Sequence, residues 1–372
     1  MQLSHHAKGE MECKTMDEIV IEYTDKDGKE RKLEIEDENN TTLDLSRHKI
    51  VTINLETLVG YNALEELNLG SNALSEIDLS PLAKLPNLTS LNLFKNKLET
   101  IDLSQLAACK KLRELNLGNN SITVLDLAPL AKYKSLARLR LFNNQITELN
   151  LSAFAKCTTL EMLEIENNQI KSIDLKALGK CTNLIQLNLM YNQLRELDIS
   201  SLATCVNLKF LYLHHNSLGS INLESLGNAT DLRILRLGGN KLDSIDIGPL
   251  APCRELRRLG LAMNAIEEID LSALKNAKKL TALDFAGNRI KSIDLSPLSK
   301  CKELTELYLH SDHPIENEFE EIDIGPLFSC DELEDIGIGE STNISAKSSL
   351  QDSEDIPLAI EELIEDDRIT WS

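Results

Sequence analysis

Seven cysteines share one position of a repeated pattern, and they are the first residues that could do chemistry. Leu85, Tyr133, Ala229 and Ala277 fill that position in other copies, so it takes apolar groups. Zinc sites normally use Cys-x-x-Cys or histidine spacings, and disulfides need Cβ atoms that face each other. We expect buried free thiols rather than a metal site or disulfides, and free thiols are typical of a reducing compartment. The cysteines are Cys109, Cys157, Cys181, Cys205, Cys253, Cys301 and Cys330.

A second ladder consists of aspartates in the other half of the repeat. Stacked carboxylates repel each other, so some group must offset their charge. Calcium is one candidate because it binds oxygen ligands, and a backbone N–H two residues further on is the other. Asn150 and Asn222 fill this position without a charge, which favours the backbone. The ladder comprises Asp78, Asp102, Asp126, Asp174, Asp198, Asp246, Asp270, Asp294 and Asp323.

No other motif predicts catalysis or a cofactor. The sequence contains no Gly-x-Ser-x-Gly elbow, no phosphate-binding Gly-x-x-x-x-Gly-Lys-Ser/Thr and no His-Glu-x-x-His. His214, His215 and His310 fall on the variable face of the expected sheet, where contact residues are more common than catalysts. We therefore expect a protein that is not an enzyme and needs no cofactor.

The scaffold beneath these ladders repeats at one constant interval, which is the spacing between Leu64 and Leu88. Such a period predicts a solenoid, in which units too small to fold alone bury a shared core by stacking. The fourth and sixth residues of each unit point inward, and the third, fifth and seventh face solvent, as strand alternation requires. A recurring Asn should satisfy backbone groups at each strand end. The units open at Leu64, Leu88, Leu112, Leu136, Leu160, Leu184, Leu208, Leu232, Leu256, Leu280 and Leu304.

The second half of each unit predicts a short strand followed by a turn of helix. In residues 77–84, Ile-Asp-Leu is the expected strand, Ser80 the expected N-cap and Pro81 the first helical residue. Because bulkier helical turns stack opposite the strands, the solenoid should bend with its main sheet on the concave side.

The pattern Leu112-x-x-Leu115-x-Leu117-x-x-Asn120-x-Ile122 resembles the leucine-rich repeat family, and the 24-residue unit resembles its longer, helix-containing classes. The resemblance covers roughly residues 40–340. It implies an α/β solenoid, a curved horseshoe with a concave parallel β-sheet and short strands and helical turns on the convex side. It also implies binding of proteins or peptides on the concave sheet, without catalysis.

Both ends depart from the repeat. We predict an N-terminal segment with a β-hairpin cap (1–39), the solenoid (40–340) and an acidic C-terminal cap with a short helix (341–372). Asp27-Gly28 between alternating runs indicates a hairpin over 18–36. The register slips in a loop over 311–321, and residues 356–364 predict a helix that covers the last apolar rung.

The net charge of −21 is concentrated at the two ends. Residues 1–40 carry −6 and residues 312–372 carry −17, whereas residues 41–311 carry +2. Without a positive excess, nucleic-acid binding is disfavoured. No stretch reaches the roughly 18 apolar residues that cross a bilayer, and the first residues lack the apolar core of a secretion signal. We predict a cytoplasmic protein, simplest as a monomer, without a nucleic-acid or membrane partner.

The solvent-facing residues of the central strands are the candidate binding surface. Both ends of the sheet carry small and polar residues, whereas the middle concentrates side-chain types that are enriched at interface hot spots. We predict a scaffold that binds a protein or peptide. A regulator that inserts an arginine into a partner GTPase or phosphatase, and a cation-binding solenoid that uses the aspartates, are the alternatives. The candidate residues are Arg138, Arg140, Phe142, Met162, Glu164, Met190, Tyr191, Phe210, Tyr212, His214, Ile234 and Arg236.

Overall fold

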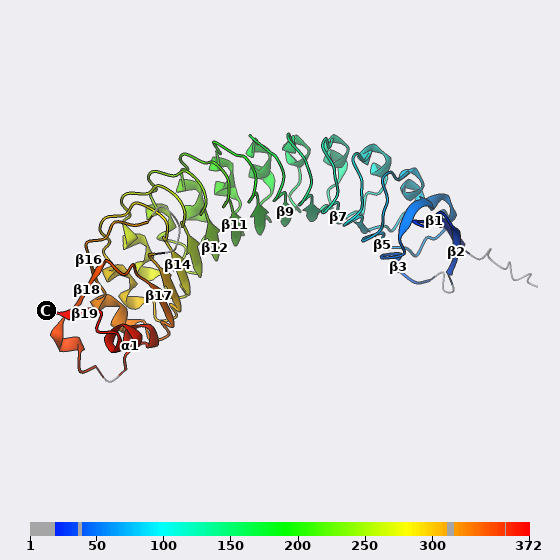
Figure 1. Cartoon of the computed structure of the whole chain (residues 1–372). Coiled ribbons are helices and arrows are strands. Elements are labelled where there is room, and N and C mark those ends of the chain that lie inside the picture. Colours follow the sequence, from blue (N-terminus) through cyan, green and yellow to red (C-terminus); the bar gives the residue numbers. More distant parts are fainter. Residues whose placement is uncertain (1–18, 36–38, 311–315, 354) are drawn as a thin grey trace, which may run out of the picture.

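The computed structural model describes residues 19–35, 39–310, 316–353 and 355–372. Cys13 and part of the expected loop over 311–321 lie outside these residues. The chain forms one curved solenoid with its main sheet on the concave side and helical turns on the convex side (Figure 1). The predicted α/β horseshoe is confirmed.

The concave sheet has 13 parallel strands, each three residues long, and consecutive repeats pair in register. Phe210 pairs with Ile234, for example, and Tyr212 with Arg236. In order along the sheet the strands are β3 (Thr42–Asp44), β5 (Glu66–Asn68), β6 (Ser90–Asn92), β7 (Glu114–Asn116), β8 (Arg138–Arg140), β9 (Met162–Glu164), β10 (Gln186–Asn188), β11 (Phe210–Tyr212), β12 (Ile234–Arg236), β13 (Arg258–Gly260), β14 (Ala282–Asp284), β15 (Glu306–Tyr308) and β17 (Asp335–Gly337).

The repeated leucines form the core and the repeated asparagines close it. Leu187 and Leu189 are fully buried, as the alternation predicts. The Asn192 amide donates to the carbonyl oxygens of Ile165 (3.1 Å) and Leu189 (3.2 Å), and its oxygen accepts from the N–H of Ile170 (3.1 Å). Each rung therefore satisfies backbone groups of its own repeat and of its neighbour.

The convex side consists of 3-10 helices. They are η1 (Leu55–Leu58), η2 (Ser80–Lys84), η3 (Leu103–Leu106), η4 (Ala128–Lys132), η5 (Leu151–Phe154), η6 (Lys176–Lys180), η7 (Ser200–Thr204), η8 (Glu224–Asn228), η9 (Gly248–Leu250), η10 (Leu271–Asn276), η11 (Ser296–Lys300), η12 (Gly325–Ser329) and η13 (Ser348–Leu350).

Two local predictions for this side are wrong. Ser80 is the first residue of η2 rather than its cap, and the Asp78 carboxylate accepts from the Ser80 N–H (2.9 Å). The Ile-Asp-Leu segments of the described central repeats form no strands. The reason is curvature, because the outer arc is longer than the inner one and the outer segments move beyond the roughly 4.8 Å that strand pairing needs.

Both ends of the solenoid are capped. The hairpin expected over 18–36 is confirmed: β1 (Ile19–Asp25) and β2 (Glu30–Ile35) pair antiparallel, and β1 also pairs with β4 (Ile50–Asn54). Gly28 at the turn has a φ of 73°, which suits glycine.

At the other end, β16 (Glu321–Asp323), β18 (Asn343–Ala346) and β19 (Ile369–Trp371) form a separate parallel sheet (Figure 1). The predicted helix is α1 (Leu358–Glu365), which packs against β17 and buries Ala359 and Ile360. The division at residues 39 and 340 stays a prediction. Among the described residues, no helix has the length and apolar character to cross a membrane.

Candidate binding surface on the concave sheet

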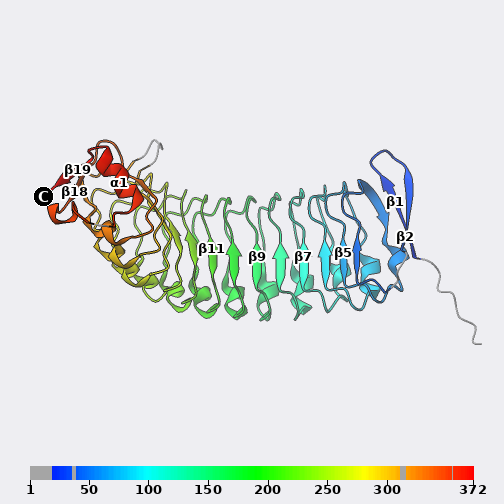
Figure 2. The same cartoon turned by 90° about the horizontal axis from the view of Figure 1, so that it is seen from below.

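The predicted site residues lie on β8 to β12 and in the turns directly after these strands. Figure 2 shows the strands side by side, so residues one repeat apart form rows across the sheet. Most of these side chains are half-buried between their row neighbours, whereas Tyr191 (48% exposed) and Arg236 project into solvent. Their role in binding stays a prediction.

Arg138 and Arg140 on β8 are already paired within the chain. Arg138 contacts Glu114, and its other guanidinium nitrogen lies 3.8 Å from Glu161. The Nε atom of Arg140 donates to Glu164 at 2.9 Å. Neither guanidinium could enter the active site of a partner enzyme, as the regulator alternative requires, without breaking these pairs.

Apolar side chains and one carboxyl group follow β8 to β10. The Phe142 ring lies over Gly118, where a Cβ atom would come within 2.7 Å of it, and packs against Phe94 at 5.8 Å between centroids. Glu166 occupies the row position between Phe142 and Met190, and its buried Oε2 atom has no hydrogen-bond partner in the ranges that the structure describes. Burial and then the nearby Glu164 raise the pKa of Glu166 to about 7.

Tyr191, Tyr212, His214 and His215 form an aromatic cluster beside β11. The rings of Tyr191 and His215 stack with centroids 4.3 Å apart, and His214 lies edge-on to Tyr191 at 5.8 Å and to Tyr212 at 6.2 Å. The Nδ1 atom of His214 is buried, and no residue in the described part of the chain forms a hydrogen bond with it. Burial, then His215 and Arg236, lower the pKa of His214 to about 4, so its ring is neutral at physiological pH.

Next to this cluster lies a hollow of about 230 Å³, which sequence reasoning missed. Small residues on and after β12 to β14 create it: Gly238, Gly260, Ala262 and Ala282. The rings of His214 and His215 border it at one end and Tyr308 at the other. The succession of small residues on adjacent strands beside an aromatic group is the sequence signal that indicates such a hollow.

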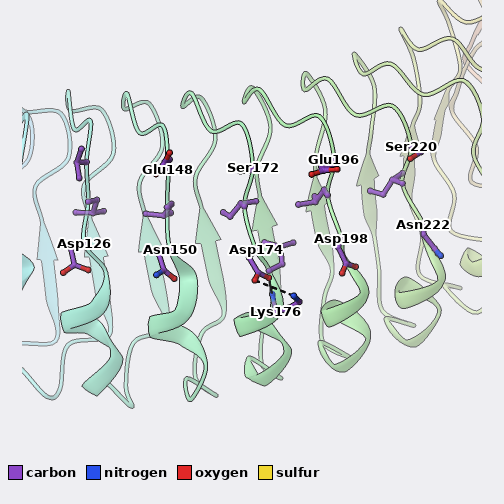
Figure 3. A pocket seen from close by; sticks show the side chains of 17 residues that line it. Asp126, Glu148, Asn150, Ser172, Asp174, Lys176, Glu196, Asp198, Ser220 and Asn222 are labelled. Carbon is purple, nitrogen blue, oxygen red and sulfur yellow. Dashed lines mark hydrogen bonds and ion pairs between the residues drawn. The ribbon is translucent and has the colours of Figure 1, made fainter.

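A shallower groove of about 930 Å³ runs along the convex side (Figure 3). Asp174 and Asp198 line it, and their carboxylates accept from the N–H groups of Lys176 (2.9 Å) and Ser200 (2.8 Å). Asn150 makes the same contact with Ser152 at 2.9 Å. The structural interpretation of the aspartate ladder is therefore confirmed. In the described part of the chain, no three His, Cys, Asp or Glu side chains are grouped to hold a metal.

The seven repeated cysteines are buried free thiols, as predicted. Six of them donate to carbonyl oxygens of the preceding repeat, as Cys109 does to Leu82 at 3.2 Å and Cys205 to Leu178 at 3.5 Å, and Cys157 donates to Leu136 of its own repeat at 3.5 Å. Burial raises the pKa of both thiols to about 11. The cytoplasmic location stays a prediction.

Comparison with known families agrees with this architecture. A family model described as leucine rich repeat matches residues 39–98, 86–146, 134–194 and 254–313, and a second model of the same description matches residues 207–229. Together they cover more than half of the sequence. The chain belongs to the leucine-rich repeat family.

Solved structures show the same fold. An internalin (inlF) from Listeria monocytogenes is 28% identical, with a TM-score of 0.61, and the match covers 82% of this chain and 88% of that one. A leucine-rich repeat protein from Leptospira interrogans is 25% identical, with a TM-score of 0.70 and coverage of 82% and 72%. The functional domain of InlJ from Listeria monocytogenes, described as including a cysteine ladder, is 24% identical, with a TM-score of 0.65 and coverage of 84% and 66%. No curated protein sequence matches the chain.

Proposed function

We propose that this chain is a non-enzymatic scaffold that binds a protein or peptide on its concave sheet, centred on β10 to β13. The observation that carries the proposal is the aromatic cluster directly beside the hollow. A rigid sheet presents both, so a partner can insert a side chain into the hollow and pack against rings with little loss of entropy.

The side chains on this surface are of the kinds that dominate binding energy. Tyr191 stacks on His215 and is 48% exposed, and Met263 lines the hollow and is 42% exposed. Phe210 and Tyr212 lie on β11 between them and face away from the leucine core. Exposed apolar groups gathered on one face mark interaction sites more often than scattered ones do.

A truncation experiment tests this proposal. A library of 12-residue peptides displayed on phage is selected on the immobilised full chain, and the enriched peptides are synthesised for titration calorimetry. Phe210→Ala combined with Tyr212→Ala should raise the Kd at least about 30-fold, the equivalent of about 2 kcal/mol at a hot spot. Lys180→Ala, on the convex side, should leave the Kd unchanged.

Circular dichroism should show both variants folded, because neither change touches the core. If Lys180→Ala weakens binding and the double truncation does not, the concave assignment is wrong. A selection that enriches no peptide also contradicts the proposal.

A further inference from the structure

Three cations stand side by side where β11, β12 and β13 begin. Lys209, Arg233 and Arg257, called the basic row here, occupy the same position of consecutive repeats. The N–H of Arg233 donates to the Lys209 carbonyl and that of Arg257 to the Arg233 carbonyl, both at 2.8 Å, so the three residues are direct neighbours. Like charges on adjacent strands repel, and a folded protein normally offsets them with acids.

In the described part of the chain, no carboxylate forms an ion pair with these cations. Glu255 lies near Arg233 and Arg257, but its two carboxylate oxygens accept from Lys279 at 2.8 and 2.7 Å. The Nε atom of Arg233 is buried and has no acceptor among the described residues.

Arg236, further along β12, extends this uncompensated charge into the hollow. It is exposed and makes no ion pair in the part of the chain described. The acid that faces it, Asp284, is half-buried and accepts from the N–H of Ala286 at 3.2 Å. Arg258 forms an ion pair with Glu306, with 3.5 Å between a guanidinium nitrogen and a carboxylate oxygen. Arg236 therefore differs from Arg138 and Arg140, whose charges are paired with Glu114 and Glu164 of the same chain.

We propose that β11 to β13 bind an acidic peptide segment of the partner, whose carboxylates contact the basic row and Arg236 while one apolar side chain enters the hollow. This inference rests on the proposed function and adds the chemistry of the partner. Unpaired cations, a guanidinium donor without an acceptor and an adjacent hollow lined in part by small glycine and alanine residues match an acidic segment with an apolar anchor.

The extent of the row favours a peptide over a nucleic acid. Three strands span only about 10 Å, and the row continues into Ile185 and Glu161 on one side and Thr281 on the other. A nucleic acid carries a phosphate at every nucleotide and would cross Glu161, Glu164 or Glu306, where repulsion replaces attraction. A short acidic segment fits within the row.

The test uses the same phage selection on the full chain. Selection on the wild-type chain should enrich peptides with net negative charge and at least one large apolar residue. For an enriched peptide, Lys209→Gln with Arg233→Gln and Arg257→Gln should raise the Kd at least about tenfold, and added NaCl should weaken binding to the wild type. A matched variant, Lys156→Gln with Lys180→Gln and Lys275→Gln, removes the same charge from exposed sites elsewhere and should bind like the wild type.

Arg257→Gln alone, at an exposed side chain, gives a second measurement that does not depend on folding of the triple variant. The inference is overturned if enriched peptides carry no negative charge, or if neutralising the basic row leaves the Kd unchanged. It is also overturned if a 12-nucleotide oligouridylate binds more tightly than the peptides and loses its affinity in the triple variant. If the binding of the peptides depends on Phe210 and Tyr212 but not on the basic row, this inference is overturned and the proposed function stands.

Discussion

The ring of His215 stacks on the ring of Tyr191, with centroids 4.3 Å apart and an angle of 14° between the planes. Both residues occupy the same position of consecutive repeats, and both have left-handed backbones with φ values of 54° and 51°. The next repeat places Gly239 there, with a φ of 63°. The stack therefore ends where a side chain is missing, and the hollow begins at that point.

Gly239→Ala should disturb the aromatic cluster and the fold together. The added Cβ atom would lie 2.6 Å from the Nδ1 atom of His215, which must move, and the positive φ strains any L-residue. We expect a loss of about 1 kcal/mol in the free energy of unfolding, measured by urea denaturation, and weaker peptide binding. Gly219→Ala is the matched control, because its Cβ atom would meet nothing within 4 Å. Equal stabilities for the two variants would refute this description.

The fold was largely predictable because it depends on a period. A leucine that recurs at one constant interval fixes the inward face, the strand position and the pairing partner at once, and Asp27-Gly28 identifies the hairpin locally. Features that depend on breaks in the period were not predictable. After the inserted loop, Asn317 takes the position of the recurring asparagine and donates to the carbonyl oxygens of Phe285 at 2.9 Å and Leu309 at 2.7 Å. Its distance in sequence from Asn288 differs from the repeat length, so the period does not identify it. The sheet of β16, β18 and β19 joins segments that share no motif.

The position of the candidate residues on the sheet was predictable, but their pairing and charge were not. The face and the central strands follow from alternation, whereas the charge on that face depends on which side chains pair across strands. Glu114 stands one repeat before Arg138, and Glu164 stands one repeat after Arg140, so a comparison of row neighbours would have found these pairs. Burial of a row position such as Glu166 depends on how the neighbouring side chains pack, which the pattern does not encode.

Glu166→Gln should stabilise the protein at high pH. The folded-state pKa of about 7 lies above the ordinary value of 4.5, so the folded state holds a proton that the unfolded state releases, and stability falls as the pH rises from about 4.5 to about 7. At pH 8 the variant should be more stable by about 1 kcal/mol, after discounting the shift for partial exposure, and near pH 4 the difference should vanish. Thermal unfolding at both pH values measures this. The exposed Glu148→Gln makes the same charge change, and a similar gain there at pH 8 would contradict the assignment.

The repeated thiols should react only after unfolding. Burial raises the pKa of Cys181 and Cys330 to about 12, which removes the thiolate that a disulfide reagent needs. Titration with such a reagent at pH 7.5 should modify the repeated cysteines in urea but not in the folded chain. Cys13, outside the described residues, is the one thiol that we expect to react in the folded chain. Rapid labelling of Cys157, Cys181 and Cys205 without denaturant would overturn this prediction.

The stability of the protein should survive replacement of a ladder aspartate by asparagine but not by alanine, which lacks the accepting oxygen. The Asp198 carboxylate accepts from the N–H of Ser200 at 2.8 Å, a bond that an amide oxygen can also accept, as Asn150 does. Asp198→Asn should keep the unfolding temperature close to wild type, whereas Asp198→Ala should lower it by removing the acceptor of that N–H. Calcium should not change the unfolding temperature of the wild-type chain. A rise with calcium that Asp198→Asn abolishes would instead support the cation-binding alternative.

Hydroxyl-radical footprinting of the chain bound to a selected peptide tests the central claim most directly. Tyr191 and Met263 are 48% and 42% exposed on either side of the hollow, and Val124 is 71% exposed in the convex groove. If the concave surface binds the peptide, oxidation of Tyr191 and Met263 should fall at saturation while that of Val124 stays constant. Protection of Val124 with unchanged oxidation of Tyr191 and Met263 would place the partner on the convex side and contradict the account.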